Sequence, residues 1–346
     1  MREISSLELY RIAHELSFLE GSYLRKFYET GKGEFELLFY KSEPYFVYVK
    51  LLKSVNLTKY VGEHEKATQF AMQIRKRLEN KRLEKVYQYN TDRILIFEFG
   101  EYKLILEMFA KGNLILVDKE MKIIAPYKRI EYKERKIDYN ELYKFPARGE
   151  VQSTGKLIAV LSKKFDMGPI YVEDAILRHG LMPDENIENI DAKKMEELEE
   201  YISGLRERAL ESKPLLYIKE QEYSLFPLEK YKGSEAKEYD SLSSLLDDFY
   251  ISERGKEEKE EDKEREAIRK SIEQQKALIE KLEEEEKTYR EIAEMILYNI
   301  NELNELIDYI KRSRKPSVEE LNAISGKIKV KGIDLKNKRV KVEVSS

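Results

Sequence analysis

The sequence has no cysteine, no tryptophan and only three histidines among its 346 residues. Without cysteine the chain has no disulfide bond, thiolate zinc site, iron–sulfur cluster or cysteine nucleophile. The histidines, His14, His64 and His179, stand far apart, and no spacing typical of a metal site links them. We therefore expect neither a metal ion nor another cofactor.

Long apolar runs are missing as well. No stretch reaches the roughly 20 apolar residues that cross a bilayer, and the N-terminus lacks the apolar centre of a signal peptide. Charged residues make up 38% of the chain, yet the net charge is only -4, so both signs are interspersed. The phosphate-binding loops and nucleophile turns of common enzymes do not occur. These features predict a cytoplasmic protein without a membrane span or a catalytic motif, in which any basic surface is local.

The chain does contain a long heptad repeat, in which apolar side chains return alternately every four and three residues. This period of 3.5 residues is typical of a coiled coil. The seam consists of Ile268, Ile272, Gln275, Ile279, Leu282, Glu286, Tyr289, Ala293, Ile296, Ile300, Leu303, Ile307 and Ile310. No second heptad stretch of comparable length occurs. Either the protein dimerises through this helix, or a returning helix lies downstream in a longer protein of which this chain is a fragment.

The whole sequence predicts an α+β protein in five segments. Residues 1–150 form a β-rich domain with two helices, 151–212 a small helical domain, and 213–250 a hairpin and a connecting helix. Residues 251–313 form the coiled-coil helix, and 314–346 form a small tip with one short helix and two strands. The first helix opens with the capping-box spacing of Ser5 and Glu8, and the second helix covers about 63–78.

Short β-rich runs separated by turn residues predict antiparallel strands in the first segment. These runs are 23–28, 35–40, 45–51, 83–89, 94–99, 103–109, 113–117 and 122–127. A later hairpin, 215–219 with 222–227, could return to the first sheet. A helix is expected at about 192–210.

In the helical segment, the runs 157–165 and 171–177 flank the turn Asp166-Met167-Gly168-Pro169. Two short helices joined in this way suggest a helix-hairpin-helix motif. In that motif exposed backbone N–H groups at the turn meet a phosphate, which makes Gly168 a candidate RNA contact. The same pattern also occurs where two helices only pack together.

Two stretches are locally basic, and tyrosines are interleaved with their cations. The candidate RNA contacts in them are Arg75, Lys76, Arg77, Lys128 and Arg129. Cations beside aromatic faces suit an RNA backbone with unstacked bases, although a charged surface with half-buried tyrosines explains the pattern equally well. At the end of the first stretch, Asp92-Arg93 stands at a hairpin entry, where an aspartate commonly forms the turn and an arginine is exposed or locally paired.

Several ordered motifs together resemble the N-terminal domain of the NFACT family. They are Leu7-Glu8-Leu9-Tyr10 with Glu15-Leu16, Met72 to Leu78, Thr91-Asp92-Arg93-Ile94, and Glu107-x-Phe109-x-x-Gly112-Asn113 followed by Leu116. The resemblance implies a fold similar to the formamidopyrimidine-DNA glycosylases, which use a proline after the initiator methionine as nucleophile. Here Arg2 stands at that position, which argues against glycosylase activity and leaves a DNA-binding or DNA-repair protein as the alternative function.

The resemblance implies a role in ribosome-associated quality control. Family members bind large ribosomal subunits obstructed by peptidyl-tRNA, hold tRNA and support template-free tailing of the nascent C-terminus, while the ribosome forms the bond. The family's aspartate-arginine pair falls on Asp92 and Arg93, and a family acidic residue falls on Glu8. In the family the coil is an antiparallel hairpin, so residues 327–344 would belong to its tip, and we expect this fragment to form a homodimer through the exposed seam.

Overall fold

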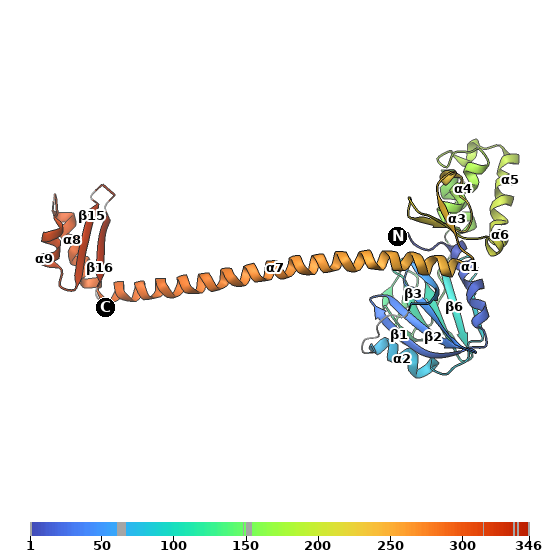
Figure 1. The fold of residues 1–346 in the computed structure, drawn as a ribbon, viewed down its shortest axis with the longest axis horizontal. Helices are drawn as coiled ribbons and strands as arrows, with labels where there is room; N and C mark the ends of the chain where they lie inside the picture. The colour runs from blue at the N-terminus through green and yellow to red at the C-terminus, as the bar shows by residue number, and fades with distance from the viewer. Residues whose placement is uncertain are drawn as a thin grey trace. The chain divides into compact units, whose positions relative to one another are not determined.

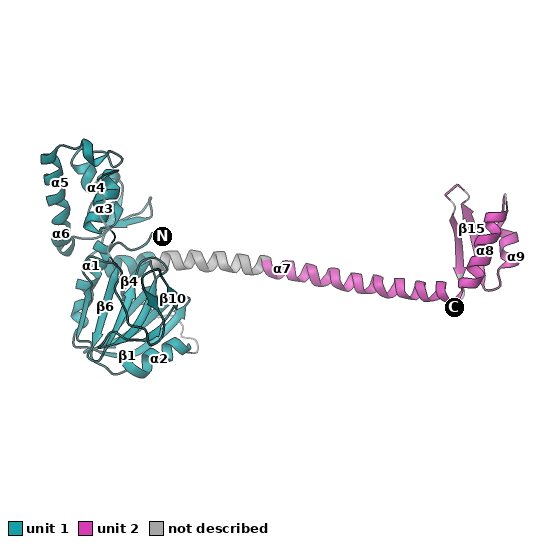
Figure 2. Ribbon diagram, turned by 180° about the vertical axis from the view of Figure 1, so that it is seen from behind, with its two compact units in different colours: residues 1–255 teal, residues 256–346 magenta. Residues whose placement is uncertain are grey.

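The computed structural model describes residues 2–60, 67–147, 149, 154–313, 315–334, 336–337 and 339–344, with the side chains of 250–267 and 344 left out. The chain divides into two compact units, residues 1–255 and 256–346 (Figure 2). Both units contain helices and antiparallel strands (Figure 1), which confirms the predicted α+β class. In the part of the chain described, no helix is both long enough and apolar enough to cross a membrane.

The first helix, α1 (Ser6–Leu16), lies at the centre of the first unit. The predicted capping box is present, because the Ser5 hydroxyl accepts the Glu8 N–H and the Glu8 carboxylate accepts the Ser5 N–H. Leu9, Ile12 and Leu16 are fully buried. A short 3-10 helix, η1 (Ser17–Leu19), follows α1 and leads into the first strand.

Two antiparallel meanders form the body of this unit. The first sheet has the order β1 (Tyr23–Gly31), β2 (Glu34–Tyr40), β3 (Pro44–Lys50) and β4 (Ser54–Thr58), and the second has the order β5 (Lys85–Gln88), β6 (Ile94–Phe99), β7 (Tyr102–Glu107), β8 (Asn113–Asp118) and β9 (Ile123–Pro126). Phe39 of the first sheet stacks on Phe97 and Phe99 of the second, with ring centroids 6.3 Å apart in both pairs. The inner faces of the two sheets therefore share one core. A ribbon of β10 (Ile130–Glu131) and β11 (Lys136–Ile137) follows.

Two local features of this body differ from the sequence prediction. Strand β4 was not predicted, because the turn before it contains no glycine or proline and Leu52 itself adopts the positive φ of 70°. Helix α2 (Gln69–Leu78) begins later than predicted, since the Thr68 hydroxyl accepts the Ala71 N–H at 3.1 Å and so caps the helix at this point. The rest of the predicted start, 63–66, lies outside the described residues.

The helical part of the first unit contains α3 (Leu157–Phe165), α4 (Pro169–Arg178), η2 (Ile187–Asn189), α5 (Ala192–Ser203) and α6 (Leu205–Glu211). The single helix predicted at 192–210 is wrong, because Gly204 separates α5 from α6. After them, β12 (Leu215–Tyr217) pairs with β13 (Glu222–Ser224) and β14 (Ala236–Glu238) in a sheet of their own, with η3 (Glu229–Tyr231) between the last two. The hairpin therefore does not return to the first sheet.

The long helix is displaced from its predicted bounds of 251–313. Helix α7 (Leu242–Tyr298) starts nine residues earlier, where the Glu15 carboxylate of α1 accepts the Leu242 and Ser243 N–H groups at 2.7 and 2.9 Å. It ends at Tyr298; the next residue, Asn299, has φ -105° and ψ 17°, and α8 (Ile300–Arg312) begins a separate helix. The predicted uninterrupted helix to residue 313 is therefore wrong.

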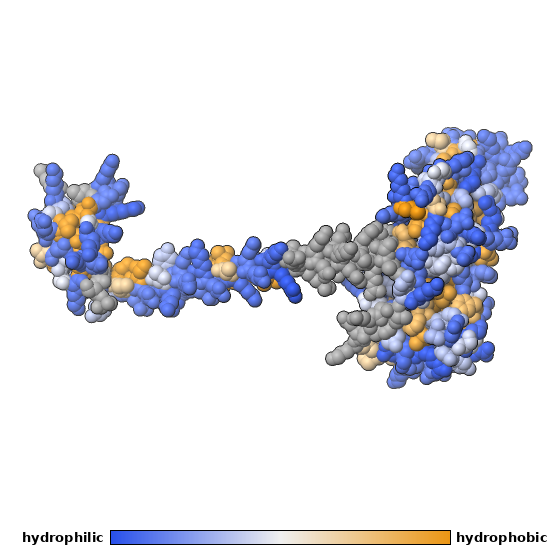
Figure 3. Space-filling view, viewed as in Figure 1, coloured by the Kyte–Doolittle hydropathy of each residue, from blue (hydrophilic) through white to orange (hydrophobic). Residues whose placement is uncertain are grey.

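The packing of the second unit explains why the long helix breaks at Asn299. Helix α8 packs with α9 (Val318–Ile324) and the hairpin of β15 (Ile328–Asp334) and β16 (Arg339–Val344), around a core of Leu306, Leu321, Ile328 and Val330. Leu303 and Ile310, which the heptad pattern placed on the seam, pack against this core instead. Upstream the seam is exposed: Ile268, Ile279 and Leu282 have exposed fractions of 59%, 54% and 54%. Figure 3 shows apolar patches on the surface of α7.

Candidate nucleic-acid interface

Asp92 and Arg93 lie in the turn that joins β5 to β6. The Tyr89 N–H donates to the Ile94 carbonyl at 2.9 Å, and the Asp92 N–H donates to the Tyr89 carbonyl at 3.0 Å. The Gln88 amide donates both to the Asp92 carbonyl, at 2.9 Å, and to the Ser6 carbonyl of α1, at 2.8 Å. The turn is thus fixed against the N-terminal end of α1.

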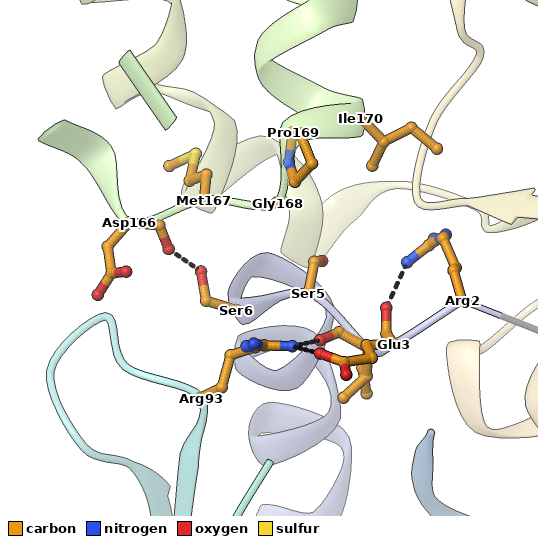
Figure 4. A pocket seen from close by; sticks show the side chains of 11 residues that line it. Arg2, Glu3, Ser5, Ser6, Arg93, Asp166, Met167, Gly168, Pro169 and Ile170 are labelled. Atoms are coloured by element: carbon orange, nitrogen blue, oxygen red, sulfur yellow. Dashed lines mark hydrogen bonds and ion pairs between the residues drawn. The ribbon is translucent and has the colours of Figure 1, made fainter. Parts of the chain in front are cut away.

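Arg93 points toward the segment that precedes α1 (Figure 4). One guanidinium nitrogen donates to Glu3 Oε2 at 2.6 Å and to the Ile4 carbonyl at 3.4 Å. The Arg93 side chain is 30% exposed and that of Glu3 is 43% exposed. Both line a cavity of about 430 Å³ that is bounded on the other side by residues 166–170, which form the α3–α4 turn and the start of α4. The Asp92–Arg93 turn and the predicted helix-hairpin-helix turn therefore face one cavity.

A second cavity of about 340 Å³ lies next to the first and shares Arg93 and Asp166 with it. Asp92, Phe109, Lys163 and Lys164 are among its lining residues. Lys164 forms an ion pair with Glu199 at 2.5 Å. A role for Phe109, Lys163 or Lys164 could not be predicted from the sequence, because nothing in their spacing shows that the end of α3 meets the β5–β6 turn.

Glu8, the third residue of the predicted tRNA site, has no exposed surface. The Arg2 guanidinium donates to both of its carboxylate oxygens, and the Tyr171 hydroxyl of α4 donates to Oε1 at 2.6 Å. Burial by itself would raise the pKa of Glu8, but the charge of Arg2 and the hydrogen bonds from Arg2, Tyr171 and the Ser5 N–H outweigh it and hold the pKa below its ordinary value. Glu8 is therefore an ionised, fully paired group beneath the cavities.

Arg2 connects this buried group to the last sheet of the unit. Its Nε donates to Glu222 at 2.7 Å, another nitrogen donates to the Tyr223 carbonyl at 3.0 Å, and the guanidinium lies 4.3 Å from the centre of the Tyr223 ring. Arg2, α1, α4 and β13 are thus tied together by one network. The guanidinium at position 2 is therefore engaged in holding the fold together.

Gly168 lines the first cavity, whereas the five basic RNA candidates line neither cavity. Arg75 donates to the Phe27 carbonyl at 2.7 Å and lies 5.0 Å from the Tyr28 ring centre, so the last turn of α2, which also carries Lys76 and Arg77, rests on β1. Lys128 donates to the Lys111 carbonyl at 2.6 Å, and Arg129 is 68% exposed beside Asp138. Burial and the neighbouring Lys32 and Lys111 charges lower the pKa of Lys128.

Part of the second basic stretch, which runs from Lys122 to Arg148 in the sequence, faces inward. Arg135 and Glu107 form a buried ion pair with side-chain exposures of 7% and 1%, and the Tyr143 hydroxyl donates to the same carboxylate at 2.8 Å. Four of the interleaved tyrosines, Tyr87, Tyr89, Tyr132 and Tyr143, belong to the apolar cluster on this face of the second sheet. Tyr143 is buried and the other three are half-buried against this cluster, so the four do not form a fully open stacking surface for bases.

Gly168 has a packing role that a substitution can test. A Cβ at this position would lie 2.5 Å from the Ser5 Cβ, closer than two such atoms can approach. We expect Gly168→Ala to lower the free energy of unfolding by about 1–3 kcal/mol, because the α3–α4 turn and the start of α1 must separate. Urea unfolding measures the loss. Gly204→Ala is the control, since its nearest neighbours lie at an ordinary 3.7 Å, and equal stabilities of the two variants would contradict the packing role.

Comparison with known proteins identifies the family. The profile described as NFACT N-terminal and middle domains matches residues 5–325, so the chain belongs to the NFACT family, as predicted. The archaeal Rqc2 homolog aRqcH of Methanocaldococcus jannaschii is 31% identical over 306 residues, which cover 76% of this chain and 44% of that protein. The ribosome quality control complex subunit NEMF of Homo sapiens is 26% identical over 282 residues, which cover 66% of this chain and 26% of that protein. The chain thus spans less than half the length of these relatives.

Solved structures share the fold. The crystal structure of the fibrinogen binding protein from Staphylococcus aureus aligns with a TM-score of 0.57 at 19% identity, covering 71% of this chain and 98% of that one. The N-terminal structure of the fibronectin/fibrinogen-binding protein from Streptococcus suis aligns with a TM-score of 0.50 at 23% identity, covering 72% and 99%. At such identities the likeness concerns the fold alone.

Proposed function

We propose that this chain is part of a cytoplasmic ribosome quality-control factor that recognises obstructed large ribosomal subunits carrying peptidyl-tRNA. Its part in this role is to bind tRNA and to support template-free tailing of the nascent C-terminus. The names of the relatives support the ribosomal role, and the position of Arg93 between two adjacent cavities carries the assignment of the tRNA site.

The chemistry of these cavities suits an RNA backbone. Arg93 presents a planar, permanently charged donor group that can contact phosphate oxygens, and Lys163 and Lys164 add cations at the neighbouring cavity. Asp92 holds the turn through its backbone and lines the second cavity. No bond needs to be made by the protein, because in this proposal the ribosome joins the residues and the chain positions tRNA.

The buried Glu8 enters this proposal as a positioning residue. It fixes Arg2 and Tyr171, so it sets the spacing of α1 and α4 on either side of the first cavity. Among the peripheral candidates, Arg129 has a side chain that is 68% exposed. We propose that Arg75, Lys76, Arg77, Lys128 and Arg129 contact RNA backbone outside the cavities, and that Gly168 brings the α3–α4 turn close to the RNA.

Salt-dependent tRNA binding tests the site. Purified tRNA is titrated with the chain at several salt concentrations, and we expect Arg93→Ala to weaken binding and to reduce the salt slope by about one, the signature of one lost phosphate contact. Lys119→Ala, which removes a 58% exposed cation elsewhere on the unit, is the matched control. If Arg93→Ala binds tRNA with the affinity and slope of the unaltered chain, Arg93 does not contact RNA.

The exposed face of α7 supports a further proposal about assembly. Apolar side chains at heptad spacing are solvated from Ile268 to Ile296, and such a face is stable only when another helix covers it. We propose that two copies of this chain pair through α7, with Gln275 and Glu286 fixing the register.

A further inference from the structure

The Arg93 guanidinium already has an anionic partner in the free protein. Its contact with Glu3 Oε2 is 2.6 Å, within the range of a charge-assisted hydrogen bond. Figure 4 shows the two side chains meeting at the first cavity. Glu3 therefore lies where a phosphate oxygen must lie if RNA contacts this nitrogen of Arg93.

The backbone around Glu3 is held on both sides. Arg2 is fixed by Glu8, Glu222 and the Tyr223 carbonyl. On the other side, the fully buried Ile4 donates its N–H to the Leu52 carbonyl at 3.0 Å. Residues 2–4 thus form a short strap that is anchored on both sides of Glu3. This strap keeps the Glu3 carboxylate next to Arg93.

The pair is also accessible enough to exchange. With Arg93 30% exposed and Glu3 43% exposed, water can solvate each charge when the contact opens. Ion pairs of this exposure contribute little net stability. The same nitrogen of Arg93 also makes a longer contact of 3.4 Å to the Ile4 carbonyl, which does not depend on the Glu3 carboxylate.

We propose that Glu3 is an intramolecular counter-ion of Arg93, and that an RNA phosphate binds at Arg93 by replacing it. This inference rests on the proposed function, because it assumes that Arg93 contacts tRNA. The exchange would make the site selective, because a single phosphate gains little binding free energy when it displaces a carboxylate of the same charge. An RNA that makes several contacts with the protein at once can compensate for the cost of displacing Glu3.

A double-mutant cycle with purified tRNA tests this proposal. Glu3→Gln keeps the size of the side chain and removes the charge, and we expect tRNA to bind about threefold to fivefold more tightly at low salt, as the loss of an exposed competing ion pair allows. In the Arg93→Ala background the same substitution should have no such effect. Glu101→Gln, at a 68% exposed glutamate paired with Lys119, corrects for the general effect of one negative charge less. Thermal unfolding of each variant verifies that it is folded.

The outcomes separate this inference from the proposed function. A gain for Glu3→Gln that exceeds the Glu101→Gln gain and disappears without Arg93 supports the exchange. If Arg93→Ala weakens binding but Glu3→Gln behaves like Glu101→Gln, or if the gain persists without Arg93, the counter-ion proposal is wrong while the tRNA site stands. If Arg93→Ala leaves binding unchanged, or the chain does not bind tRNA, the proposed function and this inference both fail.

Discussion

Glu8→Ala is expected to lower the free energy of unfolding by about 3 kcal/mol, although the residue touches no cavity surface. The substitution leaves Arg2 without the carboxylate that accepts two of its hydrogen bonds, and it leaves the buried Tyr171 hydroxyl without its acceptor. Removing one partner of a buried ion pair is strongly destabilising for this reason. Arg2 keeps its contacts with Glu222 and the Tyr223 carbonyl. The loss of unfolding free energy should therefore lie at the lower end of the range found for broken buried ion pairs.

The same group predicts an acid dependence of stability. Because the pKa of Glu8 is held below its ordinary value in the folded chain, its contribution is complete above the unfolded pKa of about 4.3 and is lost as the pH falls through the folded pKa. Urea unfolding between pH 3 and 6 should therefore show a steeper acid loss for the unaltered chain than for Glu8→Gln.

The control for both measurements is Glu101→Ala, which removes an exposed glutamate and should change stability by no more than about 0.5 kcal/mol. If Glu8→Ala were as stable as Glu101→Ala, the network of Arg2, Glu8 and Tyr171 would not hold the unit together. The proposed positioning role of Glu8 would then be lost with it.

The seam of α7 predicts the oligomeric state of the chain. We expect the chain to be dimeric at micromolar concentration, and we expect the double substitution Ile279→Glu with Leu282→Glu to make it monomeric, because two buried apolar layers would become four apposed carboxylates. Both side chains are more than half exposed in the single chain. Light scattering after size exclusion gives the mass directly.

Lys281→Glu serves as the control, because it places the same acidic side chain on α7 away from the seam. This variant should remain dimeric. A monomeric mass for the unaltered chain at micromolar concentration would contradict pairing through α7, and a monomeric Lys281→Glu variant would show that charge rather than seam packing decides the state.

The sequence predicted the meanders and the first helix well, for local reasons. Alternating apolar residues and short polar turns specify antiparallel strands without reference to the rest of the chain. The capping box of Ser5 and Glu8 likewise depends on residues three positions apart. Strand β4 was missed because its preceding turn places Leu52, rather than glycine, at a positive φ.

Nonlocal contacts limited the remaining predictions. The heptad pattern continues past Asn299, but Leu303 and Ile310 pack against the core of the second unit instead of lying on the seam. The sequence pattern cannot show this, because the core forms only when β15 and β16 lie beside α8. In the proposed site, Asp92 and Arg93 were predicted from the family resemblance. Their meeting with Glu3 and the end of α3 joins segments that are far apart in sequence, so no spacing could reveal it.

Binding to obstructed large ribosomal subunits is the direct test of the proposed ribosomal role. Purified subunits that carry peptidyl-tRNA and vacant subunits are each sedimented with the chain, and the bound fraction is measured in both pellets. We expect more of the chain in the pellet of the peptidyl-tRNA-bearing subunits than in the pellet of the vacant subunits. This difference should be smaller for Arg93→Ala than for Lys119→Ala. Equal recovery with both kinds of subunit, or recovery with neither, would contradict the proposed ribosomal role.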